Sequence, residues 1–84
     1  MTAPADAARV VLHTRVDCHL CAEARAVVGR VCADIGEPWV EVDVDSDPEL
    51  QAEYGDRVPV VVVDDVDHAW YEVDPDRLRQ ALTG

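Results

Sequence analysis

The sequence predicts an α/β fold, a three-layer sandwich in which helices cover the faces of a four-stranded mixed β-sheet. Three observations lead to this expectation. Short β-branched segments alternate with segments of helical periodicity, in the order β-α-β-α-β-β-α. The chain has 84 residues, which is enough for one domain. A Cys-x-x-Cys motif, formed by Cys18 and Cys21, stands between the first predicted strand and the first predicted helix.

The first strand and the first helix are expected within residues 9–35. Residues 9–14 form a short, mostly apolar run that is typical of a largely buried strand. Within residues 18–35, apolar side chains recur at steps of three and four, which predicts a helix with one apolar face. That face should comprise Leu20, Ala24, Val27, Val28, Val31 and Ile35. Gly36 follows, where a left-handed helix cap favours glycine.

The second strand is expected at residues 39–45, where apolar and polar side chains alternate strictly. The alternation places Trp39 on the polar face. The buried face should comprise Val40, Val42 and Val44. A short helix should then run to about residue 54, with Ser46 or Asp47 as its cap and Pro48 in its first turn.

The last third of the chain predicts a hairpin and a final helix. Residues 59–63 are a proline followed by four valines, which favours a central strand with proline at its first position. Residues 64–68 are expected to form the turn, and residues 69–73 the returning strand. Asp74 and Pro75 repeat the helix-start pattern. The apolar face of this last helix should comprise Leu78, Ala81 and Leu82.

The composition excludes several classes of protein. The formal net charge is -11, which should repel nucleic-acid phosphates and anionic lipids, so we expect neither a nucleic-acid nor a membrane partner. No apolar run approaches the roughly 20 residues of a membrane helix, and the N-terminus lacks the pattern of a secretory signal. We therefore expect a cytoplasmic location. We also expect a monomer, with a flexible tail at residues 1–8 and a single domain at residues 9–84.

The Cys18–Cys21 motif indicates redox chemistry. Two thiols at this spacing can close a small disulfide ring. At the start of a helix, backbone N–H groups and the helix dipole favour the thiolate of the first cysteine, and the thiolate is the reactive form. The chain has only three cysteines, too few for a secreted disulfide scaffold. A C-x-x-C beside a β-α-β pattern in such a chain is typical of a thioredoxin-like redox motif.

The chain resembles the glutaredoxin-like branch of the thioredoxin fold, which includes small bacterial glutaredoxin-like domains of undefined function. The resemblance extends from about residue 9 to residue 82. It rests on Arg-Val-Asp-Cys-His-Leu-Cys at residues 15–21 and on Arg-Val-Pro-Val at residues 57–60. It implies a thiol–disulfide oxidoreductase that reduces disulfides or mixed disulfides, with Cys18 as the nucleophile and Cys21 as the resolving cysteine.

The resemblance also implies roles for three other residues. Pro59 matches the cis-proline that packs against the disulfide, and Val58 would offer backbone groups to a bound thiol peptide. Arg15 stands where glutaredoxins often have a Lys or Arg that binds a glutathione carboxylate and favours the thiolate. No bound cofactor is implied. The expected partner is a disulfide-containing protein or a low-molecular-weight thiol, with glutathione or a similar thiol as co-substrate.

The motif departs from the family between and before its cysteines. The family usually has Pro-Tyr or Gly-Pro between them, where this chain has His19 and Leu20. Asp17 would oppose a Cys18 thiolate, whereas Arg15 and a protonated His19 would favour it. Asp17 and His19 are therefore candidates for tuning the pKa of Cys18, and the sequence leaves the sign of the net shift open.

A further departure concerns glutathione. Glutaredoxins carry a Gly-Gly pair after the hairpin that holds the γ-glutamyl end of glutathione. The corresponding residues 69–72 read Ala-Trp-Tyr-Glu, and Trp70 would crowd that site. Whether glutathione binds stays open at this point.

Two other functions are alternatives. A lone C-x-x-C supplies two metal ligands, and a structural zinc site needs about four; His19, His68 or a second chain would have to add the others. An iron–sulfur cluster shared between two chains is a specific version. The fold could also serve protein binding, with the disulfide in a purely structural role.

Cys32 is expected in the core, with a regulatory thiol as the alternative.

Overall fold

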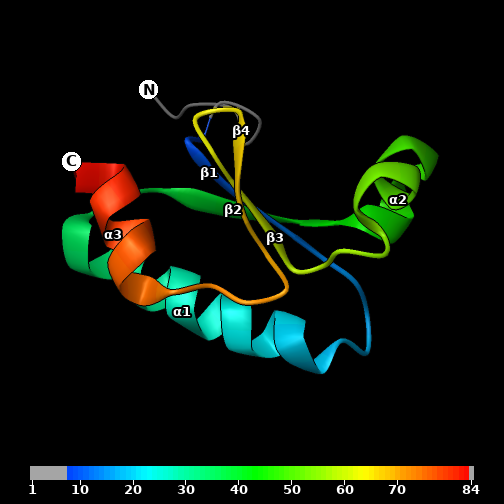
Figure 1. Ribbon diagram of the computed structural model, residues 1–84, viewed down its shortest axis with the longest axis horizontal. Helices are drawn as coiled ribbons and strands as arrows, with labels where there is room; N and C mark the ends of the chain where they lie inside the picture. Colours follow the sequence, from blue (N-terminus) through cyan, green and yellow to red (C-terminus); the bar gives the residue numbers. More distant parts are fainter. Residues whose placement is uncertain (1–7, 84) are drawn as a thin grey trace.

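The computed structural model describes residues 8–83, and its elements follow the predicted order (Figure 1). They are β1 (Val10–Thr14), α1 (His19–Ile35), β2 (Trp39–Asp43), the 3₁₀ turn η2 (Val44–Ser46), α2 (Pro48–Tyr54), β3 (Val60–Val63), β4 (Val66–Trp70) and α3 (Pro75–Thr83). The tail predicted at residues 1–8 lies, except for Ala8, outside the described residues. Its flexibility stays a prediction.

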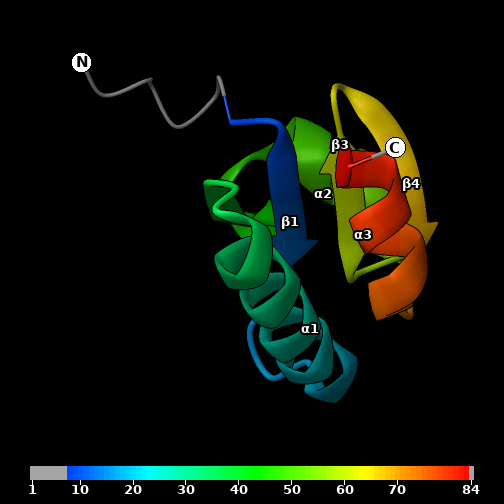
Figure 2. The same cartoon turned by 90° about the vertical axis from the view of Figure 1, so that its left-hand side faces the viewer.

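The strands form one sheet in the order β2-β1-β3-β4. β1 pairs parallel with β2 and antiparallel with β3, and β3 pairs antiparallel with β4, so the sheet is mixed. Helices α1 and α3 lie together on one face of the sheet, and α2 lies on the other (Figures 1 and 2). The predicted α/β sandwich with a four-stranded mixed sheet is confirmed. Within the described residues, no helix is long and apolar enough to cross a membrane.

Apolar side chains fill the space on both faces of the sheet. The larger cluster, under α1 and α3, comprises Val10, Leu12, Ala24, Val28, Val31, Cys32, Val61, Val63, Val73, Leu78 and Leu82. The smaller cluster, under α2, comprises Val44, Tyr54 and Val60, with Leu50, Val58 and Val62 packed against it. Because consecutive strand residues point to opposite faces, the all-valine strand β3 supplies both clusters.

The second strand begins at Trp39 as predicted but differs from the prediction in its C-terminal end and in the surroundings of Trp39. It ends at Asp43, two residues early, and Val44 begins the turn η2 while remaining buried in the smaller cluster. Trp39, expected on a polar face, packs partly buried against the larger cluster. The reason is that helices cover both faces of this sheet, so a strand residue opposite the valines still meets apolar side chains.

The hairpin also differs from the prediction. The returning strand is Val66–Trp70 rather than residues 69–73, because the turn consists of Asp64 and Asp65 alone. Both have positive φ, 52° and 67°, which matches the two-residue turns favoured in hairpins. One extra residue in β4 interrupts its register with β3 between Val61 and Val62.

The helix ends follow the sequence signals closely. Cys18 caps α1, and Gly36 ends that helix with a left-handed φ of 73°. Asp47 caps α2, and the Asp74 carboxylate accepts a hydrogen bond from the Asp76 N–H in the first turn of α3. Two side chains predicted on apolar helix faces are exposed instead, Leu20 on α1 and Ala81 on α3.

Arg9 fixes the start of β1. Its guanidinium lies 2.8 Å from a carboxylate oxygen of Asp64 in the hairpin turn and 2.8 Å from one of Glu37 after α1. These contacts link the start of β1 to the segment after α1 and to the turn between β3 and β4. The opposite sheet end, where β1 stops and β3 starts, holds the cysteine motif.

Candidate active site

The register of the sheet brings the two sequence motifs together. His13 of β1 pairs with Val60 of β3, so the chain leaving β1 toward Cys18 runs beside the residue that precedes Val60, which is Pro59. Val60 also pairs with Trp70, and the Tyr71 N–H donates to the Pro59 carbonyl oxygen at 2.8 Å. The start of α1, the start of β3 and the end of β4 therefore meet at one end of the molecule (Figures 1 and 2).

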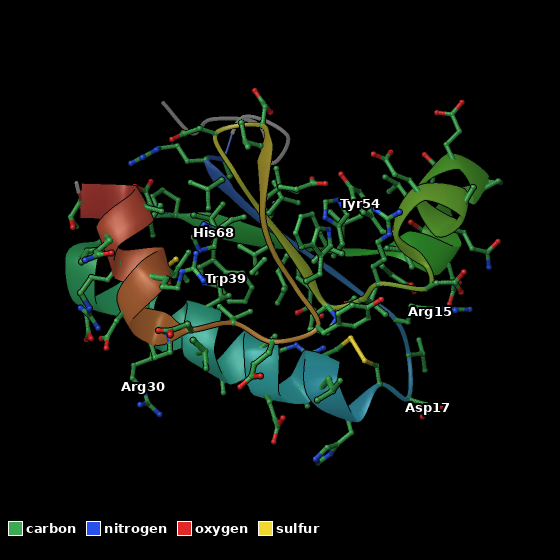
Figure 3. All side chains as sticks on the ribbon, viewed as in Figure 1. Arg15, Asp17, Arg30, Trp39, Tyr54 and His68 are labelled. Carbon is green, nitrogen blue, oxygen red and sulfur yellow. A yellow bond between two sulfur atoms is a disulfide. The ribbon has the colours of Figure 1, made fainter. Side chains whose placement is uncertain are left out.

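Cys18 and Cys21 are joined by a disulfide at the N-terminal end of α1, visible as the yellow bond in Figure 3. Their Cα atoms are 5.2 Å apart. Cys18 is the cap residue, and its Sγ accepts a hydrogen bond from the Cys21 backbone N–H at 3.1 Å. After reduction, a Cys18 thiolate would keep this donor and would face the positive end of the helix dipole.

The two cysteines differ in access. Cys18 is half-buried at the helix cap, whereas Cys21 is 0% exposed. A thiol or disulfide approaching from solution would therefore meet Cys18 first, and Cys21 is placed to react with a group already bonded to Cys18. This arrangement suits an attacking cysteine followed by a resolving cysteine.

The Val58–Pro59 peptide bond is cis, as the resemblance implied. Pro59 is buried, and Val58 is half-buried against the smaller cluster. Both residues precede β3 at the sheet end that carries the cysteines.

Arg15 lies on the loop before the cysteines, and its side chain contacts Asp45 and Gly55 (Figure 3). Its guanidinium lies 3.1 Å from a carboxylate oxygen of Asp45 and donates to the Gly55 carbonyl oxygen at 3.3 Å. The hydrogen bond from Arg15 is the main reason that the pKa of Asp45 is lowered. The positive charge of Arg15 is thus partly neutralised by the Asp45 carboxylate.

The two candidate tuning residues are both exposed. Asp17 has a φ of 60°, a left-handed conformation that Asp adopts more readily than most residues. The His19 side chain is 88% exposed, and its nearest acidic neighbour is Glu23, with 3.8 Å between His19 Nε2 and the carboxylate. Neither is packed into the site, so water screens the influence of each on Cys18.

Tyr71 is the site residue that sequence reasoning missed. It has a φ of 65°, in the region that favours glycine. It lies within residues 69–72, where the resemblance led us to expect a Gly-Gly pair. Besides the N–H bond to Pro59, its hydroxyl donates to the Asp56 carbonyl oxygen at 3.3 Å. The sequence did carry one signal, because bulky residues occupy positions 70 and 71 where a Gly-Gly pair was expected. That signal pointed to Trp70 and not to Tyr71.

A pocket of about 400 Å³ opens beside the motif, between α1 and the segment after β4. It is lined by Leu20, Glu23, Ala24, Ala26, Val27, Tyr71, Glu72 and Val73. A shallower pocket is lined by Arg57, Trp70 and Tyr71. Tyr71 contributes to both, so it forms the wall between them.

The other candidate residues lie apart from the cysteine motif. Cys32 is 1% exposed in the larger cluster, where burial raises the pKa of its thiol. His13 is buried on the α2 face, with its ring centroid 4.5 Å from that of Tyr54, and burial lowers the pKa of His13. Among residues 8–83, no group of three or more His, Cys, Asp or Glu side chains is arranged to hold a metal ion.

Residues 9–83 match the family model of the glutaredoxin-like domain (DUF836). An uncharacterised protein of Mycobacterium tuberculosis is 37% identical over 76 residues, which cover 84% of this chain and 78% of that protein. A protein of Mycobacterium bovis, also uncharacterised, matches to the same extent.

Solved structures give the same picture of the fold. The protein XcR50 from X. campestris superposes with a TM-score of 0.72 at 33% identity, over 87% of this chain and 93% of that one. The protein Ne2328 from Nitrosomonas europaea gives 0.70 at 28% identity, over 93% and 94%. A glutaredoxin from Archaeoglobus fulgidus gives 0.65 at 18% identity, over 93% and 89%, and that likeness shows the fold alone.

Proposed function

The chain belongs to the glutaredoxin-like domain family, and we propose that it is a thiol–disulfide oxidoreductase that uses the Cys18/Cys21 dithiol. The single observation that carries the proposal is the geometry of the two cysteines. They stand at disulfide distance at a helix N-terminus, with one accessible and the other fully buried. A purely structural disulfide would not require the accessible Cys18 Sγ to accept a hydrogen bond from the Cys21 N–H.

The proposed reaction proceeds in two exchanges. The Cys18 thiolate attacks one sulfur of a substrate disulfide, which forms a mixed disulfide and releases the other substrate sulfur as a thiolate. The Cys21 thiolate then attacks Cys18 Sγ. This step closes the Cys18–Cys21 disulfide and releases the second substrate thiolate. Two electrons pass from the protein to the substrate, and an external dithiol or two monothiols must return them.

The neighbouring residues would support this reaction in different ways. The backbone of Val58, before Pro59, would pair with an extended substrate segment in strand fashion. Arg15 would favour the thiolate, or bind a substrate carboxylate, to the extent that it leaves Asp45. Asp17 and His19 would tune Cys18 through their exposed charges.

A redox titration tests the proposal. The protein is equilibrated in buffers of reduced and oxidised glutathione, free thiols are alkylated, and the mass shift is read for Cys18 and Cys21. We expect the pair to be reduced with a midpoint between about -200 and -300 mV, within reach of cytosolic thiol pools. A disulfide that stays oxidised throughout this range would favour the purely structural role.

Single cysteine variants test the order of attack. Cys21→Ser should accumulate a mixed disulfide through Cys18, because the resolving thiol is missing, whereas Cys18→Ser should trap almost none. Failure of both variants to trap a mixed disulfide would refute the oxidoreductase. Cys32→Ala serves as the control and should behave like the unmodified protein in this assay.

The proposal includes a reducing compartment such as the cytoplasm, a monomeric protein, and no resident cofactor. The metal alternative has its own measurement, which is the metal and iron content of protein purified under anaerobic conditions. Stoichiometric metal that is lost in Cys18→Ser would replace the redox proposal with a ligand role for the motif.

A further inference from the structure

Exposed apolar side chains gather around the cysteine motif. Among residues 8–83, five large apolar side chains are strongly exposed, and four of them lie at the dithiol end. These four, here called the apolar collar, are Val16 (72% exposed), Leu20 (45%), Trp70 (43%) and Tyr71 (52%). The fifth, Val66, begins β4 at the other end of the sheet. Clustered exposed apolar side chains mark interaction surfaces more often than scattered ones do.

The collar borders the pocket of about 400 Å³ beside α1. Leu20 and Tyr71 belong to both, and Val27 and Val73 add apolar atoms to the pocket wall. The volume is sufficient for one bulky aliphatic or aromatic side chain. Because Leu20 lies between the two cysteines, a side chain in this pocket would belong to a residue close to the substrate disulfide.

The charges around this apolar surface are mainly negative. Glu23 and Glu72 line the pocket, which has no basic lining residue, and the exposed Asp17 precedes Cys18. Of the nearby cations, Arg15 is paired with Asp45, and Arg57 lies in the shallower pocket on the other side of Tyr71. The exposed Arg30 lies on α1 three residues beyond Val27 and does not line the pocket. A substrate with Lys or Arg beside its apolar side chain would complement this rim.

Tyr71 keeps the pocket wall in place. Its positive φ is unfavourable for a tyrosine, and hydrogen bonds to the Pro59 and Asp56 carbonyl oxygens hold it. The Tyr71 side chain therefore stays in the lining of the pocket. A glycine at this position would relieve the backbone strain and would also remove the wall.

We propose that the apolar collar and its acidic pocket bind the disulfide of a protein segment that carries a bulky apolar side chain flanked by Lys or Arg. The inference rests on the proposed oxidoreductase function and specifies its substrate class. A second copy of this chain is disfavoured as the occupant, because two chains of net charge -11 would bring acidic rims together. Glutathione, which is small and anionic, complements neither the pocket nor its charge.

The test uses symmetric disulfides of short synthetic peptides. One peptide carries Leu and two Lys next to its cysteine, a second replaces Lys by Glu, and a third replaces Leu by Ser. Pre-reduced protein is mixed with each, and released peptide thiol is measured after an acid quench. Each rate is divided by the rate with free dithiothreitol, a neutral dithiol, which corrects for the reactivity of the peptide itself.

We expect the Leu/Lys disulfide to be reduced about tenfold faster than the Leu/Glu disulfide at low ionic strength, with a smaller ratio in high salt. Replacing Leu by Ser should slow reduction several-fold. Equal corrected rates, or faster reduction of the acidic peptide, would overturn the inference while leaving the oxidoreductase intact. If no peptide is reduced, and a small neutral disulfide is not reduced either, the proposed function itself fails.

Matched variants locate the effect. Glu23→Gln combined with Glu72→Gln should remove most of the preference for Lys, whereas Asp34→Asn combined with Asp65→Asn, which removes the same charge at distant exposed positions, should keep it. An unchanged preference in the first double variant would overturn the assignment to this pocket. Light scattering on the reduced protein supplies the remaining outcome, since a stable dimer abolished by Leu20→Ser would mean that a second copy covers the collar.

Tyr71→Gly gives an independent readout that does not depend on charge. It should lose the preference for Leu over Ser and should reduce oxidised glutathione several-fold faster than the unmodified protein does. Relief of the positive φ favours folding of this variant. Glutathione reduction that stays unchanged, together with an unchanged Leu preference, would show that Tyr71 does not shape the pocket.

Discussion

The guanidinium of Arg15 lies 3.1 Å from a carboxylate oxygen of Asp45, and this pair links the loop before the cysteines to the turn after β2. Arg15 is the arginine closest in sequence to Cys18. Because Arg15 is paired with Asp45, its positive charge would stabilise a Cys18 thiolate less than an unpaired arginine at the same position would.

Removing the Asp45 charge should therefore activate Cys18. In Asp45→Asn, Arg15 loses its anionic partner, the pKa of Cys18 should fall, and alkylation of the reduced protein near pH 7 should become roughly threefold faster. The measurement is the rate of iodoacetamide labelling read by mass spectrometry. The double variant Asp45→Asn/Arg15→Gln should return to the original rate, and a single variant that labels no faster would show that Arg15 does not act on Cys18.

Cys32 should behave as a core side chain rather than as a redox thiol. It is buried among apolar neighbours, and burial raises the pKa of its thiol. A thiol reagent should leave it unlabelled in the native protein and label it only after unfolding in urea. Cys32→Ser should reduce the free energy of unfolding by about 1 to 2 kcal/mol more than Cys32→Ala does, because the serine hydroxyl would be buried among apolar side chains. Fast labelling of Cys32 in the native protein would contradict this.

Leu78 should be the main anchor of α3. It is fully buried, whereas Ala81 on the same helix is exposed. Leu78→Ala should lower the free energy of unfolding by about 2 to 5 kcal/mol, since it leaves a cavity between α3 and the sheet. The matched change Ala81→Ser should cost about 0.5 kcal/mol or less. Urea denaturation followed by circular dichroism gives both values, and similar losses would mean that Ala81 packs inward after all.

The stability of the fold should depend on pH through His13. Burial lowers the pKa of His13 in the folded state, so the unfolded chain binds a proton more readily. The contribution of neutral His13 to the free energy of unfolding is then complete above the ordinary histidine pKa of about 6.5, and it decreases as the pH drops below that value. His68, whose pKa is also lowered mainly by burial, contributes in the same direction.

The variant His13→Phe keeps an aromatic ring against Tyr54 and removes the titrating group. Urea midpoints measured between pH 7.5 and 5 should fall less steeply for His13→Phe than for the unmodified protein. This window lies above the carboxylate range, so Asp and Glu titration contributes little to the difference. An identical slope in both proteins would mean that His13 is accessible to protons when folded.

The sequence was sufficient for the order of elements and for the cysteine motif, because periodicity and helix caps are local signals. The Asp47 and Asp74 caps and the Gly36 terminator appear where their residue types indicate. The hairpin was less predictable. Two consecutive aspartates can each take a positive φ, but nothing local distinguishes that tight turn from a longer acidic loop.

The site could be predicted only in part for a related reason. Cys18, Cys21 and Pro59 belong to short motifs, and the sheet register then places them together. The engagement of Arg15 with Asp45 and the role of Tyr71 depend on contacts between segments 15 to 30 residues apart. Side-chain pairing over such separations has no signature in the sequence of one chain.

The contacts of Arg9 with Asp64 and Glu37 have a practical consequence for experiments with this protein. They hold the start of β1 at the end of the sheet opposite the disulfide. A tag or surface attachment joined at Ala8 would therefore lie at the opposite end of the sheet from the Cys18 sulfur. Immobilised Cys21→Ser protein prepared in this way would present Cys18 freely to a mixture of candidate substrates.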